Sequence, residues 1–272
     1  MRVRLGAADL VGQALDLREA AVSAKRLHRA VTDPQTELVA AASPGPLHEH
    51  VGLLRPGMEL DRRAALVAAA RSIGLEPPQA ETIAALDRQI AAIDPETPDL
   101  RAARRRVAEA GADVARLEEQ VARTSGRLNA RREADLPTDA VSDRLEDLTR
   151  ELTAAETTQI AAQEALERAE SRAAAARDAR AERLSLVDRR ENRRRAARAW
   201  LAEAVAESVE RAARALPIRA DPTAADGDPH AAALAIARAG TVSAPLVLVD
   251  SPFETALQAR AALDAPVILA RV

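Results

Sequence analysis

The chain has 272 residues, a net charge of −3 and 30% charged residues, with acidic and basic side chains interspersed. It contains no cysteine, which excludes disulfides, thiolate metal sites and cysteine nucleophiles. Aromatic residues make up only 1% of the chain, and much of its 47% hydrophobic content is alanine. We therefore expect packed helices rather than a large core built on aromatic side chains.

Residues 1–96 predict a mixed α/β lobe with two short helices near its end. Glycine and proline separate its short apolar segments, and Gly74 stands where a helix would stop. The expected elements are hairpin strands over 2–5 and 11–17, a helix over 18–31, a strand over 36–41, and helices over 59–73 and 77–93.

Residues 97–216 predict a long antiparallel coiled-coil hairpin. Apolar residues step by seven at Leu100, Val107, Val114, Val121 and Leu128, which is the spacing of a supercoiling helix. The pattern breaks near 133–139, where Pro137 stands, and resumes beyond it. A short turn between long helices favours antiparallel neighbours. The stretch 184–216 extends past the first helix, so we expect it to pack on the helices before Pro95 or on a second subunit.

Residues 217–272 predict a C-terminal βαβ lobe. A strand is expected over 217–220, a polar loop over 221–229, a helix over 230–239 and a strand at 246–249. A helix over 254–263 and a strand over 266–272 complete the lobe, and the last two strands should run parallel. The fold class is mostly α, with a small α/β end domain formed by both terminal segments.

The last forty residues resemble the second half of an ABC-type or SMC-like ATPase head. The resemblance lies in Ala-Ile-Ala-Arg-Ala at 235–239, an apolar strand ending at Asp250, Ala-Leu at 256–257, and a further apolar strand. The order of lobe, antiparallel coiled coil and lobe is also similar. The resemblance implies a parallel sheet with Asp250 at a strand end, and Asp250 there would be a candidate Mg²⁺ ligand.

The catalytic features of that family are missing from this chain. A phosphate loop needs glycines, a lysine and Ser or Thr in order, but the only lysine, Lys25, has no glycine loop before it. Ser251 stands where the family has its catalytic glutamate, and two acids at 226–228 replace the loop that holds the γ-phosphate. We therefore expect a degenerate head without ATP hydrolysis.

A second resemblance is to an uncharacterised archaeal, haloarchaeal-like coiled-coil family. It lies in the segment 51–66, the coiled coil and Asp-Ser-Pro-Phe at 250–253. Depletion of lysine fits a halophile, although a net charge of −3 is low for one. This family implies no activity.

Other candidate sites are few. His48 and His50 would converge if they stood two apart on a strand, which would suggest a metal site, although solvated loop histidines are the alternative. Arginines gather at 101–106 and 189–198. These patches suit nucleic-acid phosphates, but nearby acids favour a solvated, ion-paired helix surface.

The sequence thus predicts a non-enzymatic coiled-coil scaffold, with a protein partner or a second copy bound through the hairpin. The alternative is the degenerate SMC-like head acting in a DNA-maintenance complex. No cofactor, catalytic residue or metal site is expected, and nucleic acid is the less favoured partner. No signal-peptide run or long apolar segment occurs, so we expect a soluble, cytoplasmic protein.

Overall fold

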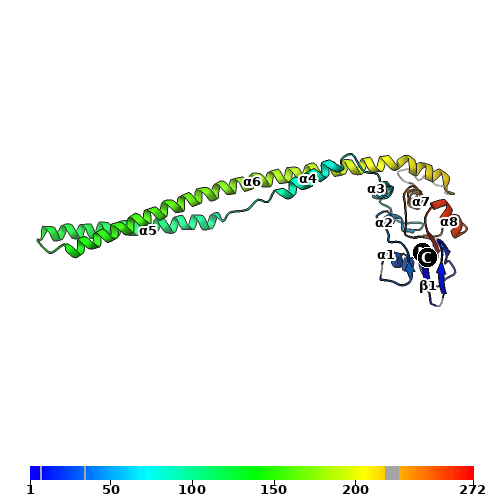
Figure 1. The fold of residues 1–272 in the computed structure, drawn as a ribbon, viewed down its shortest axis with the longest axis horizontal. Coiled ribbons are helices and arrows are strands. Elements are labelled where there is room, and N and C mark those ends of the chain that lie inside the picture. Colours follow the sequence, from blue (N-terminus) through cyan, green and yellow to red (C-terminus); the bar gives the residue numbers. More distant parts are fainter. Residues whose placement is uncertain (7, 34, 218–226) are drawn as a thin grey trace. The chain divides into compact units, whose positions relative to one another are not determined.

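The computed structural model describes residues 1–6, 8–33, 35–217 and 227–272 (Figure 1). It divides into two compact units. Residues 1–84 and 191–272 form the first, here called the end domain, and residues 85–190 form the second, the hairpin unit. The structure is mostly helical, with long packed helices and small sheets from the terminal segments, which confirms the predicted fold class.

The hairpin unit is built on α5 (Leu100–Glu133) and the first two thirds of α6 (Asp139–Ala215). The carboxylate of Asp99 caps α5 by accepting a hydrogen bond from the Ala102 amide at 3.0 Å. Arg104 pairs with Glu170, and Gly111 lies against Gln159, so the residue numbers rise on one helix as they fall on the other. The two helices are therefore antiparallel neighbours, as Figure 1 shows, and the turn lies where the sequence predicts it.

The seam between these helices is narrow. Three of its seven buried side chains are alanines. The seven are Ala110, Val114, Leu117 and Leu128 of α5, with Leu148, Ala169 and Ala176 of α6. Val107 and Val121, which belong to the same seven-residue repeat, are only half-buried. Alanine lets two helices approach closely, but its small side chain removes little apolar area from water. Because burial stabilises by about 25 cal/mol per Å² of apolar area, each buried alanine contributes little.

Helix α4 (Ala80–Ala92) extends the packing along α6. Leu86 and Ile90 bury their side chains against Leu186, and an ion pair joins Asp87 to Arg190 at 3.2 Å. Part of the stretch 184–216 is thus covered by a helix before Pro95, as the sequence predicts. Leu184 remains 64% exposed.

The end domain contains a parallel sheet made from both terminal segments. Its strands are β3 (Ala14–Asp16), β5 (Leu53–Leu54), β6 (Leu246–Val249) and β7 (Val267–Ala270), in the order β3-β7-β6-β5. Ile268 is in register with Leu15 on one side and Val247 on the other. The predicted parallel strands around α8 (Ala256–Leu263) are confirmed.

A second, antiparallel sheet has the order β2-β1-β4. It consists of β1 (Arg2–Leu5), β2 (Ala8–Val11) and β4 (Val39–Ala40). Gly6 makes the β1–β2 turn with a φ of 58°, a conformation that glycine adopts without strain. The predicted second hairpin strand over 11–17 is wrong. The chain turns after Val11, and residues 14–16 pair with β7 in the other sheet instead.

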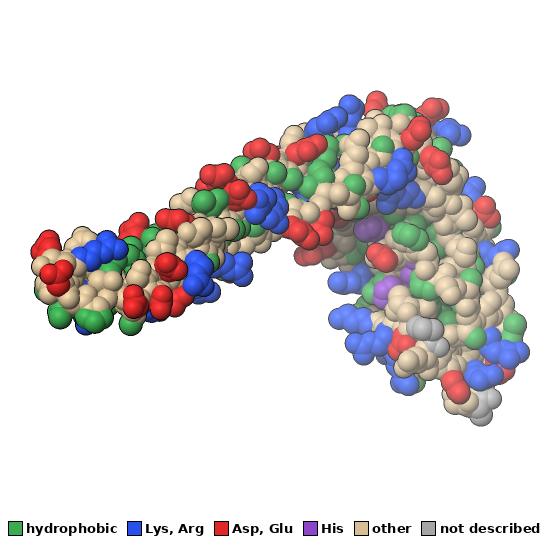
Figure 2. Space-filling view, turned by 60° about the vertical axis from the view of Figure 1, so that its left-hand side comes forward, with side chains coloured by type: hydrophobic (Ala, Val, Ile, Leu, Met, Phe, Trp, Pro, Cys, Tyr) green, Lys and Arg blue, Asp and Glu red, His purple; other side chains and the backbone are tan. Residues whose placement is uncertain are grey.

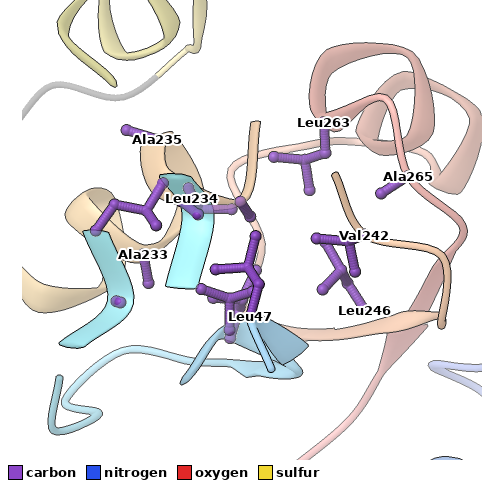
Figure 3. Close-up of a cluster of buried hydrophobic side chains, with 14 of the residues drawn as sticks. Leu47, Ala233, Leu234, Ala235, Val242, Leu246, Leu263 and Ala265 are labelled. Atoms are coloured by element: carbon purple, nitrogen blue, oxygen red, sulfur yellow. The ribbon is translucent and has the colours of Figure 1, made fainter. Parts of the chain in front are cut away.

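Helices cover both faces of the parallel sheet. They are α1 (Ala24–Thr32), α2 (His48–Val51), α3 (Arg62–Ser72), α7 (Pro229–Ala239) and α8. Val247 and Ile268 face the α1 side, whereas Leu246 and Leu269 face the α7 and α8 side. Figure 3 shows part of the cluster of buried side chains on the α7 and α8 side of the sheet, where Leu234, Leu246 and Leu263 lie together.

The last turns of α6 belong to the end domain. Leu201, Val205 and Val209 are buried in the same cluster as α3 and α7, and the division into compact units falls at 84/85 and 190/191 along the chain. The strand expected over 217–220 and most of the loop over 221–229 lie outside the described residues.

Candidate functional site

A pocket lies at the carboxyl ends of the parallel strands, with a volume of about 290 Å³. Ligands of open α/β sheets bind at this edge. The residues that line it are Ser23, Ala24, Lys25, Leu53, Arg55, Pro56, Val249, Asp250 and Val272. Two cationic side chains and one acidic side chain, from three separate segments of the chain, therefore share one pocket.

Lys25 is held at the start of α1. The Ser23 hydroxyl caps the helix by accepting from the Arg26 amide, and the Ala24 amide donates to the Arg271 carbonyl at 3.1 Å. The buried Leu27 and Val31 anchor the helix against the sheet. Lys25 thus stands on the exposed side of a helix that follows a parallel strand, in a strand–loop–helix arrangement.

Asp250 directly follows β6 and has a φ of 46°. A non-glycine residue in this left-handed region is strained, and such strain concentrates at functional sites. The segment is fixed beyond it, because the Phe253 amide donates to the Ser251 hydroxyl and the Phe253 ring is buried. Within the part of the chain that the structure describes, none of Lys25, Arg55 and Asp250 forms an ion pair.

Several amides of the loop between β3 and α1 are hydrogen-bonded within the chain. The amides of Leu17, Ala20 and Val22 donate to backbone carbonyls, and the Arg18 amide donates to Asp16. In a phosphate loop such amides face the phosphates instead. The pocket therefore offers the side-chain charges of Lys25 and Arg55 to an anion, rather than a cradle of backbone amides.

His230, at the start of α7, is a buried neighbour of Asp250. Burial lowers the pKa of His230, while the carboxylates of Asp228 and Asp250 act in the opposite direction. Its Nε2 has no hydrogen-bond partner among the described residues. Asp228 caps α7 through the His230 amide at 3.0 Å, so this helix begins as the sequence predicts.

His48 and His50 do not share a face. They lie on α2, where residues two apart point in nearly opposite directions, and not on a strand as the metal hypothesis required. His48 is buried, with its Nε2 3.0 Å from the Pro245 carbonyl, and it stacks on His28 at 5.7 Å between ring centroids. His50 lines a different groove. The described ranges contain no group of three or more His, Cys, Asp and Glu residues placed to hold a metal ion.

Several arginines of the two patches at 101–106 and 189–198 pair with acids. Arg104 pairs with Glu170, Arg105 with Glu109, and Arg194 with Glu191. Figure 2 shows acidic and basic side chains mixed along the long helices. These pairs fit an ion-paired helix surface for part of each arginine patch, whereas Arg195 and Arg198 of the second patch form no ion pair among the described residues.

Sequence reasoning identified Asp250 but missed Lys25 and Arg55 as members of its pocket. The signal for Lys25 was the helix-capping Ser23 two residues before it, which predicts a helix start after a strand. Arg55 follows a strand of two residues, which is too short to give a periodic signal.

Comparisons with known proteins give a family and no activity. One family model matches residues 12–267, and its description is a family of unknown function, DUF7856. No curated protein and no solved structure gave a match. Among the described residues, no helix is both long and apolar enough to cross a membrane. Since the match covers most of the chain, the protein belongs to the DUF7856 family of unknown function.

Proposed function

We propose that this protein is a non-hydrolysing relative of SMC-like ATPase heads that binds a phosphate-bearing ligand, such as a nucleoside triphosphate, in its end domain. The observation that carries the proposal is the shared pocket of Lys25, Arg55 and Asp250 at the carboxyl ends of the parallel strands. The pathway that fits such a head is a DNA-maintenance complex in the cytoplasm.

The chemistry of the pocket supports an anionic ligand. Lys25 and Arg55 supply two positive charges that no described carboxylate neutralises within 4.0 Å, and charge-assisted hydrogen bonds to phosphate are among the stronger ones. A volume of about 290 Å³ accommodates a phosphate chain and leaves the rest of a nucleotide outside. Asp250 would be positioned to hold a divalent cation bound with the phosphates.

The same pocket argues against hydrolysis. Ser251 follows Asp250, so no carboxylate stands at the position where the resembling ATPases carry their catalytic glutamate. Four amides of the loop between β3 and α1 are already hydrogen-bonded to the chain, which leaves fewer to stabilise a transferred phosphoryl group. Binding without turnover is therefore the expected behaviour.

Calorimetric titration of the full chain with ATP and Mg²⁺ tests this proposal. Lys25→Ala is expected to weaken binding about tenfold, because it removes one charge-assisted hydrogen bond. Arg26→Ala is the matched control. Arg26 is the neighbouring cation on α1 but does not line the pocket. Phosphate release should stay at the level of a blank.

Two results would contradict the proposal. Equal effects of Lys25→Ala and Arg26→Ala, or no binding of ATP at all, would exclude the pocket as a nucleotide site. Phosphate release that Asp250→Ala abolishes would show that the pocket retains catalysis.

A second candidate function is a protein-interaction arm, and exposed apolar side chains on α6 favour it. Ile160 is 57% exposed and Leu184 is 64% exposed, so the helix presents large side chains that the hairpin unit does not cover. A photo-crosslinking residue at 160 should capture one defined partner, or a second copy of the chain. The exposed Glu156 provides the control position. Equal labelling from both positions would contradict a specific contact.

A further inference from the structure

The end domain contains a second hollow, a groove of about 630 Å³. It lies between α3, the segment around α2, and the part of α6 that belongs to the end domain. Its lining residues carry four arginines. They are Arg63, Arg71, Arg195 and Arg198, and we call this hollow the arginine groove.

Helix geometry places these four arginines around one apolar surface at the bottom of the groove. Arg63, Val67 and Arg71 are spaced by four residues, so they follow one face of α3 and place the two arginines about 12 Å apart. Arg195 and Arg198 are one turn apart on α6. Val67 and Ala68 are buried and form an apolar floor between the charges.

Most of these arginines have no ion-pair partner in the part of the chain that the structure describes. Among the described residues, Arg63, Arg71 and Arg198 form no ion pair, and Arg195 bonds only to the amide oxygen of Asn192. Two acids also line the groove. Asp61 is engaged as the cap of α3, accepting from the Ala64 amide at 2.9 Å, and Glu49 stands near His50 on α2.

The positive surface is short. Along α6 beyond Arg198, the next three charged residues are all acidic, Glu203, Glu207 and Glu210. A long nucleic-acid backbone following this helix would meet repulsion within two turns. A compact anion that fits a hollow of about 630 Å³ would stay within reach of the four arginines, which outnumber the two acids of the groove, and would not meet these glutamates.

We propose that the arginine groove binds a compact small molecule carrying two or more phosphate groups. Guanidinium groups match phosphate oxygens in two-pronged hydrogen bonds. Four such groups around one hollow supply more positive charge than a single phosphate needs. This site is separate from the Lys25 pocket, with which it shares no lining residue, and it does not depend on the proposed nucleotide binding.

Calorimetric titration of the Lys25→Ala chain with inorganic triphosphate tests the groove, because this background weakens the other pocket. Arg71→Ala and Arg198→Ala are each expected to weaken binding about tenfold. Arg193→Ala is the control. Arg193 is exposed on the same helix but does not line the groove. Circular dichroism checks that each variant remains folded.

Three outcomes would overturn the proposal. The first is that triphosphate does not bind. The second is that Arg193→Ala weakens binding as much as Arg198→Ala, which would mean general attraction to a basic surface. The third is that duplex DNA binds through Arg71 and Arg198 while triphosphate does not, which would identify the groove as a nucleic-acid contact.

Discussion

The end domain and the hairpin unit use the same alanine-rich composition in different ways. The end domain fully buries large branched side chains such as Leu54, Leu248 and Ile268 around a parallel sheet. Between α5 and α6, the hairpin unit buries only a narrow line of alanine, valine and leucine side chains. Burial of apolar area stabilises the first, whereas helix propensity and many small side-chain pairs contribute more to the second.

Both units contain paired arginines, but the end domain also gathers, at its hollows, arginines without an ion-pair partner within the described ranges. Along the hairpin unit, arginines pair with acids one turn away, as Arg123 does with Glu119 and Arg168 with Glu164. In the end domain, the arginines of the groove and Arg55 keep no acidic partner among the described residues. Paired arginines solubilise a helix, whereas unpaired ones gathered at a hollow are available to a ligand.

Truncating one leucine in each unit should give the largest difference between them. Leu248→Ala should lower the free energy of unfolding by about 3 kcal/mol, because it leaves a cavity in a closely packed core. Leu148→Ala should cost about 2 kcal/mol, since the seam around it is thin. Urea unfolding followed by circular dichroism measures both. Equal losses would mean that the hairpin seam is packed as well as the sheet.

Substituting glycine by alanine should act with opposite sign in the two units. A Cβ at Gly240 would lie 2.4 Å from the buried Leu47 side chain, so Gly240→Ala should cost about 1–3 kcal/mol. Gly126 lies inside α5 with open space around it. Gly126→Ala should therefore stabilise by about 0.5–1 kcal/mol. Thermal unfolding of both variants measures the signs, and destabilisation by Gly126→Ala would contradict the open environment.

Acid should weaken the end domain selectively. Burial lowers the pKa of His48 below its ordinary value of 6.5, and burial together with His48 lowers the pKa of His28. As the pH falls below 6.5, these histidines bind protons more readily in the unfolded chain than in the folded one. Their contribution to the free energy of unfolding is therefore present above pH 6.5 and is lost as the pH falls below it. Residues 85–190 contain no histidine. Urea unfolding between pH 7.5 and 5 measures the loss, which His48→Gln should reduce.

The smallest effect is expected from the surface pairs of the hairpin unit. The exposed pair of Glu119 and Arg123 should contribute about 0.3–0.5 kcal/mol, because solvent and salt screen it. A double-mutant cycle with Glu119→Ala and Arg123→Ala measures the coupling energy. A coupling above 1 kcal/mol, or one insensitive to salt, would show that these pairs stabilise the unit more than their exposure suggests.

The hairpin could be predicted because its signals are local and repeated. The seven-residue step from Leu100 to Leu128 and the break at Pro137 fix two helices and a turn without tertiary information. The C-terminal strands were equally readable, since Leu246–Val249 is a continuous apolar run that a sheet buries on both faces.

The N-terminal sheet and the site could not be predicted in the same way. β5 has two residues, and β3 has three that pair with a strand more than 250 positions away, so neither has a local pattern. Asp250 was recognisable as a residue after a strand. Its association with Lys25 and Arg55 depends on the order of the strands, which periodicity does not encode. His48 and His50 were misplaced because a one-turn helix leaves too short a pattern to separate it from a strand.

The alanine seam also affects how the length of the hairpin could change over evolution. Each seven-residue segment of α5 faces a matching segment of α6, and few of their contacts are irreplaceable in size or shape. Removing one heptad from each helix at facing positions keeps every remaining seam residue on its inward face. Relatives of this chain are therefore expected to differ in paired multiples of seven residues across this region, and to conserve in length the segments that build the sheet.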